Sequence, residues 1–579
     1  MPLRRQLALL ALIAGAFALL VAQAGSAAQA KPKPKKKHPV HHKAKPKPKP
    51  PTVAQRFAKV KHVVVIYEEN HSFDNLYGGW EGVNGRTATP PANTTQVNQA
   101  GTPFTCLLQV DVNLTTPPLD AACTDTTTGS TFTSHFVNAP FVIDTYIAPT
   151  DTTCPPPLQA FSFPNGVKKG SGLPGGCTRD LVHEFYQEQY QLNGGQQNRY
   201  VTGSDAVGLT MGVYDTKTLP VYKYLHQPSH PKYVIEDNFF QSAFGGSFLN
   251  HQWLIAAATP TYPGGPAGLH SIIDSNGMPV KYPLYNPTGP VLRGPLTVVC
   301  PSPVPGRACG DYAVNTMQPS SPPSGAFGAK LPLQTAPTIG DRLTAKGVDW
   351  AWYAGGWANA AGETTSPGYT NGAGPSCLAA DTIPGSTYPS CPSNLFQFHH
   401  QPFVYYANYA PGTPGRAHLQ DEVVFQQLAS ASSTSCQLKP VSFVKPVGSE
   451  NEHPGYASEP NGSSHLVSLL QSIEGSACAK DTMVVVAYDE FGGQWDHVPP
   501  PGQAGNAGPH DQFGPGTRIP ALVIAPNLTR PFSVDHAQHD TTSILATIEH
   551  RYGVAPLGTR DAAVKDLSTV FAASAPSKK

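Results

Sequence analysis

Two segments of the sequence place adjacent acidic residues directly after an apolar run. VVVIY at 63–67 leads into EENH at 68–71, and MVVVAY at 483–488 leads into DE at 489–490. Ligands of open α/β sheets bind beyond the carboxyl ends of the strands. We therefore expect these polar groups to meet at one sheet edge as oxygen ligands for a divalent cation, although an acidic pair can also simply end a strand in solvent. The candidate ligands are Glu69, Asn70, Asp489 and Glu490.

A hydroxyl group suited to nucleophilic attack lies in a third segment, DNFFQSAFGGSFLNH at 237–251. Gly245 and Gly246 would let the backbone approach a ligand closely and would present Ser247 for attack or for metal ligation. A Gly-Gly-Ser turn is also common in ordinary loops. Alone, the turn is therefore weak evidence that Ser247 is a nucleophile.

Strands alternate with helices along the chain. Apolar, β-branched runs at 63–67, 441–444, 483–488 and 521–524 are typical of strands covered on both faces. Helices are expected from Asp180 to about Leu192 and from Thr541 to Tyr552, the latter with Asp540 as N-cap and Gly553 as stop. The pattern predicts an α/β sandwich with a largely parallel central sheet flanked by helices. Long Gly/Pro-rich stretches at about 85–175, 258–335 and 358–400 read as surface insertions that could shape a cleft.

The amino-terminal residues predict export. Residues 1–30 combine Arg4 and Arg5, an apolar run from Leu7 to Val21 and small residues before Ala30, as in a signal peptide, with a retained membrane anchor as the alternative. Residues 31–52 form a Lys/Pro-rich segment that favours a disordered linker, and its charge could contact an anionic envelope. We expect one catalytic domain at 53–573 and a secreted or cell-envelope-associated protein.

The overall charge and the cysteines argue against some kinds of partner and active site. A net charge of +1 does not indicate a nucleic-acid partner. Ten cysteines in an exported chain favour disulfides, and the absence of C-x2-C spacing argues against a zinc site and a thiol nucleophile. Pairing sequence neighbours would give Cys106–Cys123, Cys154–Cys177, Cys300–Cys309, Cys377–Cys391 and Cys436–Cys478.

An ordered set of motifs from about Lys61 to Asp561 resembles the bacterial phosphoesterase family that contains secreted phospholipases C and an acid phosphatase. The motifs are EENHSFDNLYG, GSDAVGLTMGVYDTKTLPVYKYL, EDNFFQSAFGGSFLNHQWL, DRLTAKGVDWAWY, ENEHPGY, VVVAYDEFGGQWDHVPPP and GPGTRIPALVIAPN. The resemblance implies an alkaline-phosphatase-like α/β core. It also implies a metal-dependent hydrolase of phosphate esters.

Site roles follow from the same resemblance. Ser247 falls at the nucleophile position, and one divalent metal ion of unknown identity would be held by Ser247 together with Glu69, Asn70, Asp489 and Glu490. His183 and His453 match histidines near the family's site and could contact phosphate or protonate the leaving oxygen. Asp496 and His497 match a later Asp-His motif whose direct role stays open.

Two positions depart from the family pattern. Ser247 replaces a frequent Thr and keeps the hydroxyl, whereas His71 stands where Arg is usual, which would make any phosphate contact there depend on pH.

The substrate could be a phosphate monoester or a phospholipid head group. Trp80, Trp357 and Tyr369 are available for lipid contact, and peripheral contact with a membrane or cell wall is possible. The alternative is a catalytically inactive envelope-binding protein tethered by the basic linker. A sulfatase is disfavoured because the sequence holds no Cys/Ser-x-Pro-x-Arg motif. The oligomeric state is open.

Overall fold

The computed structural model of the chain describes most of the predicted catalytic domain. The described residues are 50–576 except 87–88, 90, 110–118, 128, 130, 148–179, 205, 266–310, 326–328, 370–395 and 456. The predicted signal peptide at 1–30 and nearly all of the linker at 31–52 lie outside them, as do three of the five predicted disulfides. These expectations, and the domain boundaries, stay predictions. Within the described part of the chain, no helix is long and apolar enough to cross a membrane.

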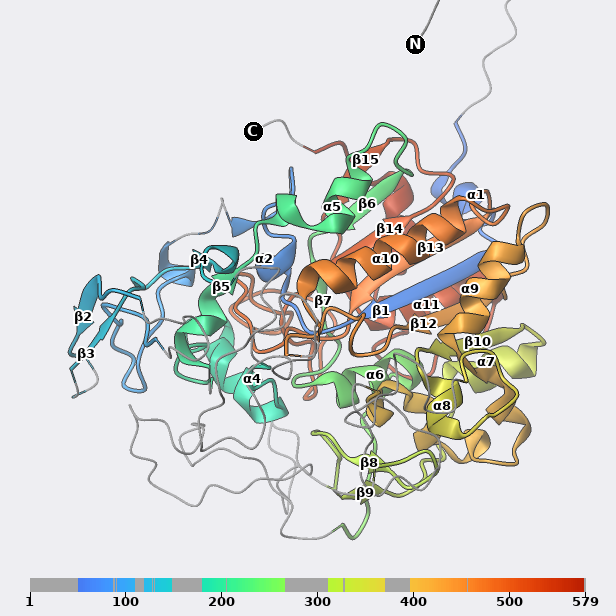
Figure 1. Cartoon of the computed structure of the whole chain (residues 1–579), viewed down its shortest axis with the longest axis horizontal. Coiled ribbons are helices and arrows are strands. Elements are labelled where there is room, and N and C mark those ends of the chain that lie inside the picture. Colours follow the sequence, from blue (N-terminus) through green and yellow to red (C-terminus); the bar gives the residue numbers. More distant parts are fainter. Residues whose placement is uncertain are drawn as a thin grey trace, which may run out of the picture. The chain divides into compact units, whose positions relative to one another are not determined.

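An eight-stranded sheet forms the centre of the fold, in the order β11-β10-β12-β1-β13-β14-β6-β15 (Figure 1). Its strands are β1 (His62–Glu68), β6 (Tyr233–Glu236), β10 (Trp350–Ala354), β11 (Leu419–Asp421), β12 (Val441–Lys445), β13 (Thr482–Tyr488), β14 (Ala521–Ile524) and β15 (Phe532–Asp535). Only β14 runs against its neighbours. The predicted α/β fold with a largely parallel sheet is therefore confirmed.

The strand β1 occupies the middle of this sheet and is buried from Val63 to Glu68. It pairs in parallel with β12 on one side and β13 on the other. The last pair in the register with β13 joins Glu68 and Tyr488. Because parallel strands end at the same edge, Glu69 and Asp489 leave the sheet side by side, as the sequence predicted.

Helices flank the sheet on both faces. In Figure 1, α9 and α10 lie in front of the central strands and α11 lies behind them. The helices are α1 (Val53–Phe57), α2 (Phe73–Leu76), α4 (Phe185–Leu192), α5 (Pro220–Leu225), α6 (Ser247–Ala256), α7 (Ile339–Lys346), α8 (Trp357–Ala361), α9 (Glu422–Ala431), α10 (Glu459–Glu474) and α11 (Thr542–Tyr552).

Two predicted helix starts were wrong. The helix α4 begins at Phe185 rather than at Asp180, because Glu184 has extended backbone angles and acts as the N-cap. His183 therefore lies in an extended segment before the helix. In α11 the N-cap is Thr541 rather than Asp540, so the helix begins one residue later than predicted. Asp540 belongs to a short strand, and its Oδ1 accepts a hydrogen bond from the Thr542 backbone N–H at 2.7 Å. The predicted stop at Gly553 is confirmed by its left-handed conformation, with φ of 64°.

The predicted insertions contain short elements and one of the two described disulfides. The short strands within the insertions are β2 (Cys123–Asp125), β3 (Phe132–Ser134), β4 (Phe141–Val142), β8 (Gln318–Pro319) and β9 (Lys330–Leu331). Three more short strands lie outside the insertions: β5 (Gly212–Val213), β7 (Phe239–Phe240) and β16 (His539–Asp540). The disulfides Cys106–Cys123 and Cys436–Cys478 form as predicted.

Candidate active site

The hydroxyl group of Ser247 faces the residues that follow β1. Ser247 Oγ donates to Glu69 Oε2 at 3.0 Å and lies 3.2 Å from Asn70 Oδ1. Ser247 is also the first residue of α6, so its side chain lies near the positive end of the helix dipole. This geometry brings together three of the residues predicted from separate motifs.

The turn that presents Ser247 is held by side-chain contacts to its backbone. Glu188 Oε2 accepts hydrogen bonds from the Gly245 N–H and from Gln241 Nε2. Asn250 Oδ1 accepts from the Ala243 N–H at 2.9 Å. A Cβ on Gly245, whose φ is +88°, would come within 2.6 Å of the Phe185 backbone nitrogen. The glycine thus permits close approach of the first residue of α4.

The acidic residues after β1 and β13 are fully buried beside one another. The Asn70 N–H donates to Asp489 Oδ1 at 3.2 Å, and the Gly492 N–H donates to Glu490 Oε2 at 2.5 Å. Glu490 Oε1 is buried and accepts no hydrogen bond from the described residues. Ligand atoms of Glu69 and Asp489 lie within 4.8 Å of one another and of His251.

Burial opposes ionisation of these carboxyl groups. Burial, with the nearby charge of Asp489, raises the pKa of Glu69 and of Glu490 well above the usual range. Burial also raises the pKa of Asp489. Three buried carboxyl groups and an orphaned oxygen fit a divalent cation, which would stabilise their ionised forms.

One buried ammonium group already contacts this cluster. Lys445, the last residue of β12, forms an ion pair with Glu69 Oε1 and donates to the Tyr67 carbonyl at 2.9 Å. Its single charge cannot balance three carboxylates. Sequence reasoning predicted the strand but did not consider the residue that ends it, although the rule about carboxyl ends applies to β12 as well.

Two histidines that sequence reasoning gave no role complete this side of the site. His400 Nε2 lies 3.2 Å from Glu69 Oε1, and the His400 ring stacks on His251 with centroids 5.0 Å apart. His251 Nδ1 faces the Ser247 carbonyl at 2.7 Å. Burial lowers the pKa of both histidines well below the usual range, so both are neutral at pH 7. His251 lies in the same motif as Ser247 and could have been considered from the sequence. His400 ends a Gly/Pro-rich insertion without periodicity, so no sequence pattern indicated it.

The two predicted catalytic histidines lie together on the other side of Asn70, with ring centroids 6.2 Å apart. His453 Nδ1 faces the Pro454 carbonyl at 2.7 Å, so Nδ1 carries the proton and Nε2 accepts from Asn70 Nδ2 at 2.7 Å. This contact turns Asn70 Oδ1 toward Ser247. His183 Nε2 lies 3.7 Å from Glu490 Oε1.

Asp496 and His497 belong to a separate buried cluster. Arg518 Nε lies 3.1 Å from Asp496 Oδ1, and Arg518 Nη2 lies 3.2 Å from Asp74 Oδ1. His497 Nδ1 contacts Asp74 Oδ2 at 2.5 Å. The guanidinium supplies the positive charge here. The cluster joins the loop after β13 to α2 and to the segment before β14.

His71, where any phosphate contact was expected to depend on pH, has both ring nitrogens against protein groups. The His71 ring is fully buried, with Nε2 2.9 Å from the Glu452 carbonyl and Nδ1 2.6 Å from Asn75 Oδ1. Burial lowers its pKa to about 4. Both ring nitrogens therefore contact protein groups, and the ring stays neutral at physiological pH.

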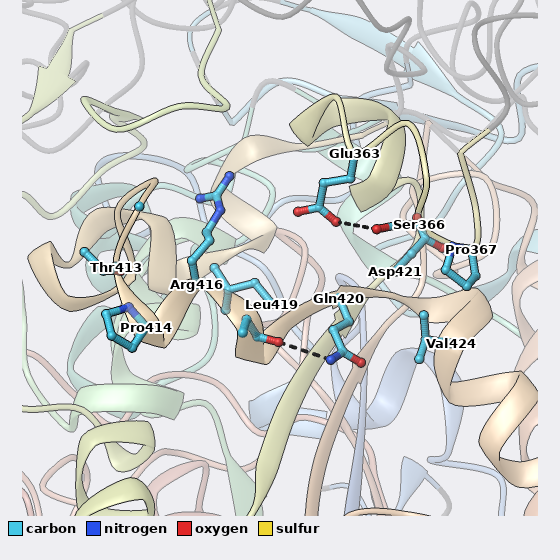
Figure 2. Close-up of a pocket in the computed structure, with 12 residues that line it drawn as sticks. Glu363, Ser366, Pro367, Thr413, Pro414, Arg416, Leu419, Gln420, Asp421 and Val424 are labelled. Carbon is cyan, nitrogen blue, oxygen red and sulfur yellow. Dashed lines mark hydrogen bonds between the residues drawn. The ribbon is translucent and has the colours of Figure 1, made fainter.

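Of the three aromatic residues considered for lipid contact, Tyr369 is half-buried and the two tryptophans are buried. Trp80 and Trp357 are buried, and the Arg416 guanidinium lies 4.5 Å from the centre of the Trp357 ring. Arg416 also lines a cavity of about 760 Å³ at the end of β11, together with Glu363 and Asp421 (Figure 2). None of the predicted catalytic or metal-binding residues lines this cavity.

Comparisons with known proteins show several relatives of this chain. Phospholipase C B of Mycobacterium tuberculosis is 24% identical over 544 residues, covering 89% of this chain and 78% of that protein. Phospholipase C A of the same organism is 22% identical over 543 residues, with the same coverage. A solved protein of the alkaline phosphatase superfamily from Vibrio parahaemolyticus shows 13% identity and a TM-score of 0.25, covering 62% of this chain and 65% of that one. Residues 60–555 match the Phosphoesterase family, and the chain therefore belongs to this family of hydrolases acting on phosphoric ester bonds.

Proposed function

We propose that the chain is an exported, metal-dependent phosphoesterase that uses Ser247 as its nucleophile. The observation that carries this proposal is the contact of Ser247 Oγ with Glu69 Oε2 at 3.0 Å and with Asn70 Oδ1 at 3.2 Å. A hydroxyl beside buried carboxylates at a helix amino terminus is suited to attack on an anionic phosphate.

In the first step Ser247 Oγ forms a bond to phosphorus while the bond from phosphorus to the ester oxygen breaks. The hydroxyl proton moves toward Glu69 Oε2, which already accepts it as a hydrogen bond. Water then cleaves the bond between serine and phosphorus, which restores Ser247 and releases the phosphorylated product.

A divalent ion, when bound, would polarise the phosphate oxygens and offset the negative charge of the transferring group. The residues that would hold it are Glu69, Asn70, Ser247, Asp489 and Glu490, as the sequence predicted. The buried oxygen of Glu490 without a hydrogen-bond partner supports this assignment.

The two histidines have different roles in this proposal. His453 Nε2 holds the Asn70 amide and orients its oxygen, which makes His453 a positioning residue. His183 has Nδ1 against the Leu181 carbonyl at 2.6 Å, and its partly exposed ring can present Nε2 to the leaving oxygen. We assign the proton donor to His183.

The proposed substrate is the phosphodiester of a phospholipid head group. The names of the two mycobacterial relatives, both phospholipases C, support a diester over a monoester. Export by residues 1–30 would bring the enzyme to such lipids. The competing function is the inactive envelope-binding protein, which the joint placement of Ser247, Glu69 and Asp489 disfavours.

The test compares p-nitrophenylphosphorylcholine with p-nitrophenyl phosphate, using purified protein and a panel of divalent metals. Ser247→Ala should lower kcat on the order of 10³-fold or more. Ser242→Ala is the matched control, because Ser242 is another fully buried serine in the same segment. Faster hydrolysis of the choline diester would support the proposed substrate, and preference for the monoester would contradict it. Absence of hydrolysis with every metal would favour the inactive binding protein.

A further inference from the structure

A second group of acidic residues and a histidine lies at the carboxyl ends of β6 and β15. Glu236 ends β6 and Asp535 ends β15, and the two residues are direct partners in the parallel register. His539 follows in β16. Ligand atoms of the three residues lie within 4.8 Å of one another, and all three side chains are buried.

Three of the four carboxyl oxygens of Glu236 and Asp535 accept no hydrogen bond from the described residues. Both oxygens of Glu236, which is fully buried, accept no hydrogen bond from the described residues. Asp535 Oδ1 accepts from the Ala537 N–H at 2.9 Å, whereas Asp535 Oδ2 is buried without a partner. A buried carboxylate without donors is costly unless a cation compensates for it.

The histidine is oriented to bind a metal ion. His539 Nδ1 lies 3.1 Å from the Ser543 hydroxyl, which can accept, and 3.2 Å from the Lys565 carbonyl, which can only accept, so both contacts favour a proton on Nδ1. This leaves the lone pair of Nε2 on the side of Glu236 Oε2, 3.9 Å away. A ligating imidazole commonly has such a carbonyl behind it. The Thr569 hydroxyl, 3.0 Å from Nε2, is a further oxygen at the site.

We propose that Glu236, Asp535 and His539 bind a divalent cation at a site separate from that of Ser247. Two carboxylates and one imidazole match the ligand preferences of Zn²⁺ and Mn²⁺. The antiparallel strand β14 separates β6 from β13 in the sheet. The ion would stabilise the fold by joining the ends of two strands to the carboxyl-terminal segment that contains Lys565 and Thr569.

The test counts bound metal. Purified protein is stripped with EDTA, loaded with Zn²⁺ or Mn²⁺, freed of excess ion and analysed by mass spectrometry for metal per chain. The variants are Glu236→Gln, Asp489→Asn and the double variant. Glu549→Gln is the matched control, since Glu549 is another buried glutamate outside the cluster.

We expect Asp489→Asn to retain an ion that the double variant loses. Glu236→Gln should weaken metal binding at the Glu236 site on the order of 100-fold. Addition of the metal should raise the unfolding temperature of Asp489→Asn but not that of the double variant. If Glu236→Gln does not fold, Asp535→Asn replaces it. Metal content that is the same with and without Glu236 overturns the proposal. An ion lost with Asp489 alone overturns it as well.

Discussion

Removal of the ammonium group of Lys445 should destabilise the protein strongly when no divalent metal is present. The Lys445 side chain is 1% exposed and that of Glu69 is 0% exposed, so neither charge is solvated by water. Removing one partner of a buried ion pair leaves the other charge uncompensated, at a cost of about 3–5 kcal/mol. Lys445→Met should therefore lower the free energy of unfolding in EDTA by this amount.

The assay is equilibrium urea unfolding, in EDTA and with a divalent metal. Metal should restore more stability to Lys445→Met than to the parent, because the carboxylates then have another cation. The matched control is Lys439→Met. Its ion pair with Asp349 joins side chains that are 22% and 57% exposed, and surface pairs contribute at most about 1 kcal/mol.

A double-mutant cycle with Glu69→Gln isolates the pair. If the two charges stabilise each other, the double variant loses less stability than the two single variants combined. A loss below about 1 kcal/mol in EDTA for Lys445→Met, or strict additivity in the cycle, would refute the reasoning.

Three further predictions concern other contacts. His453→Leu should lower kcat by about 10- to 100-fold with little change in KM, because it releases Asn70 rather than the substrate; an equal rise in KM in steady-state kinetics would contradict this role. Burial lowers the pKa of His465, but the contact with Glu422 at 2.7 Å outweighs it and raises the pKa to about 9. The ion pair of protonated His465 with Glu422 therefore contributes up to about 3 kcal/mol to the free energy of unfolding, fully below about pH 6.5, and this contribution is lost as pH rises through about 9. Urea unfolding of His465→Gln should not show this loss. A pH profile of stability in that variant equal to that of the parent would contradict the role of this pair. Replacing Cys436 and Cys478 by alanine opens a loop of 42 residues, which should cost about 4 kcal/mol of unfolding free energy; a loss below about 1 kcal/mol would contradict the chain-entropy account.

The sequence predicted the parts of the site that depend on strand ends. The runs before Glu69 and Asp489 are continuous and apolar, and the rule about parallel sheets brings their ends together. The Gly-Gly-Ser turn alone was weak evidence for Ser247, and the resemblance of the ordered motifs to the family placed it at the nucleophile position. Placement of the three together needed the motif order, since no local pattern encodes contacts between distant segments.

The other features of the site and fold depend on tertiary contacts, which could not be predicted from the sequence. His400 follows an insertion with no periodicity, and the burial of His71 comes from packing rather than from its neighbours in sequence. Asp540 has the residue type of an N-cap, but pairing of β16 with β7 holds it in a strand. The helix therefore begins at Thr542, one residue later than predicted, although the propensity of Asp was correctly recognised.

The central position of β1 has a consequence for the order in which the chain can fold. Its two neighbours, β12 and β13, begin at Val441 and Thr482, although β1 itself is the first strand to be synthesised. Until those segments have left the ribosome, the apolar residues of β1 have no native partner on either side. Pairing between such distant segments is slow, and the exposed strand is prone to aggregate in the interval. Chains that end before Thr482 should therefore need a chaperone to remain in solution.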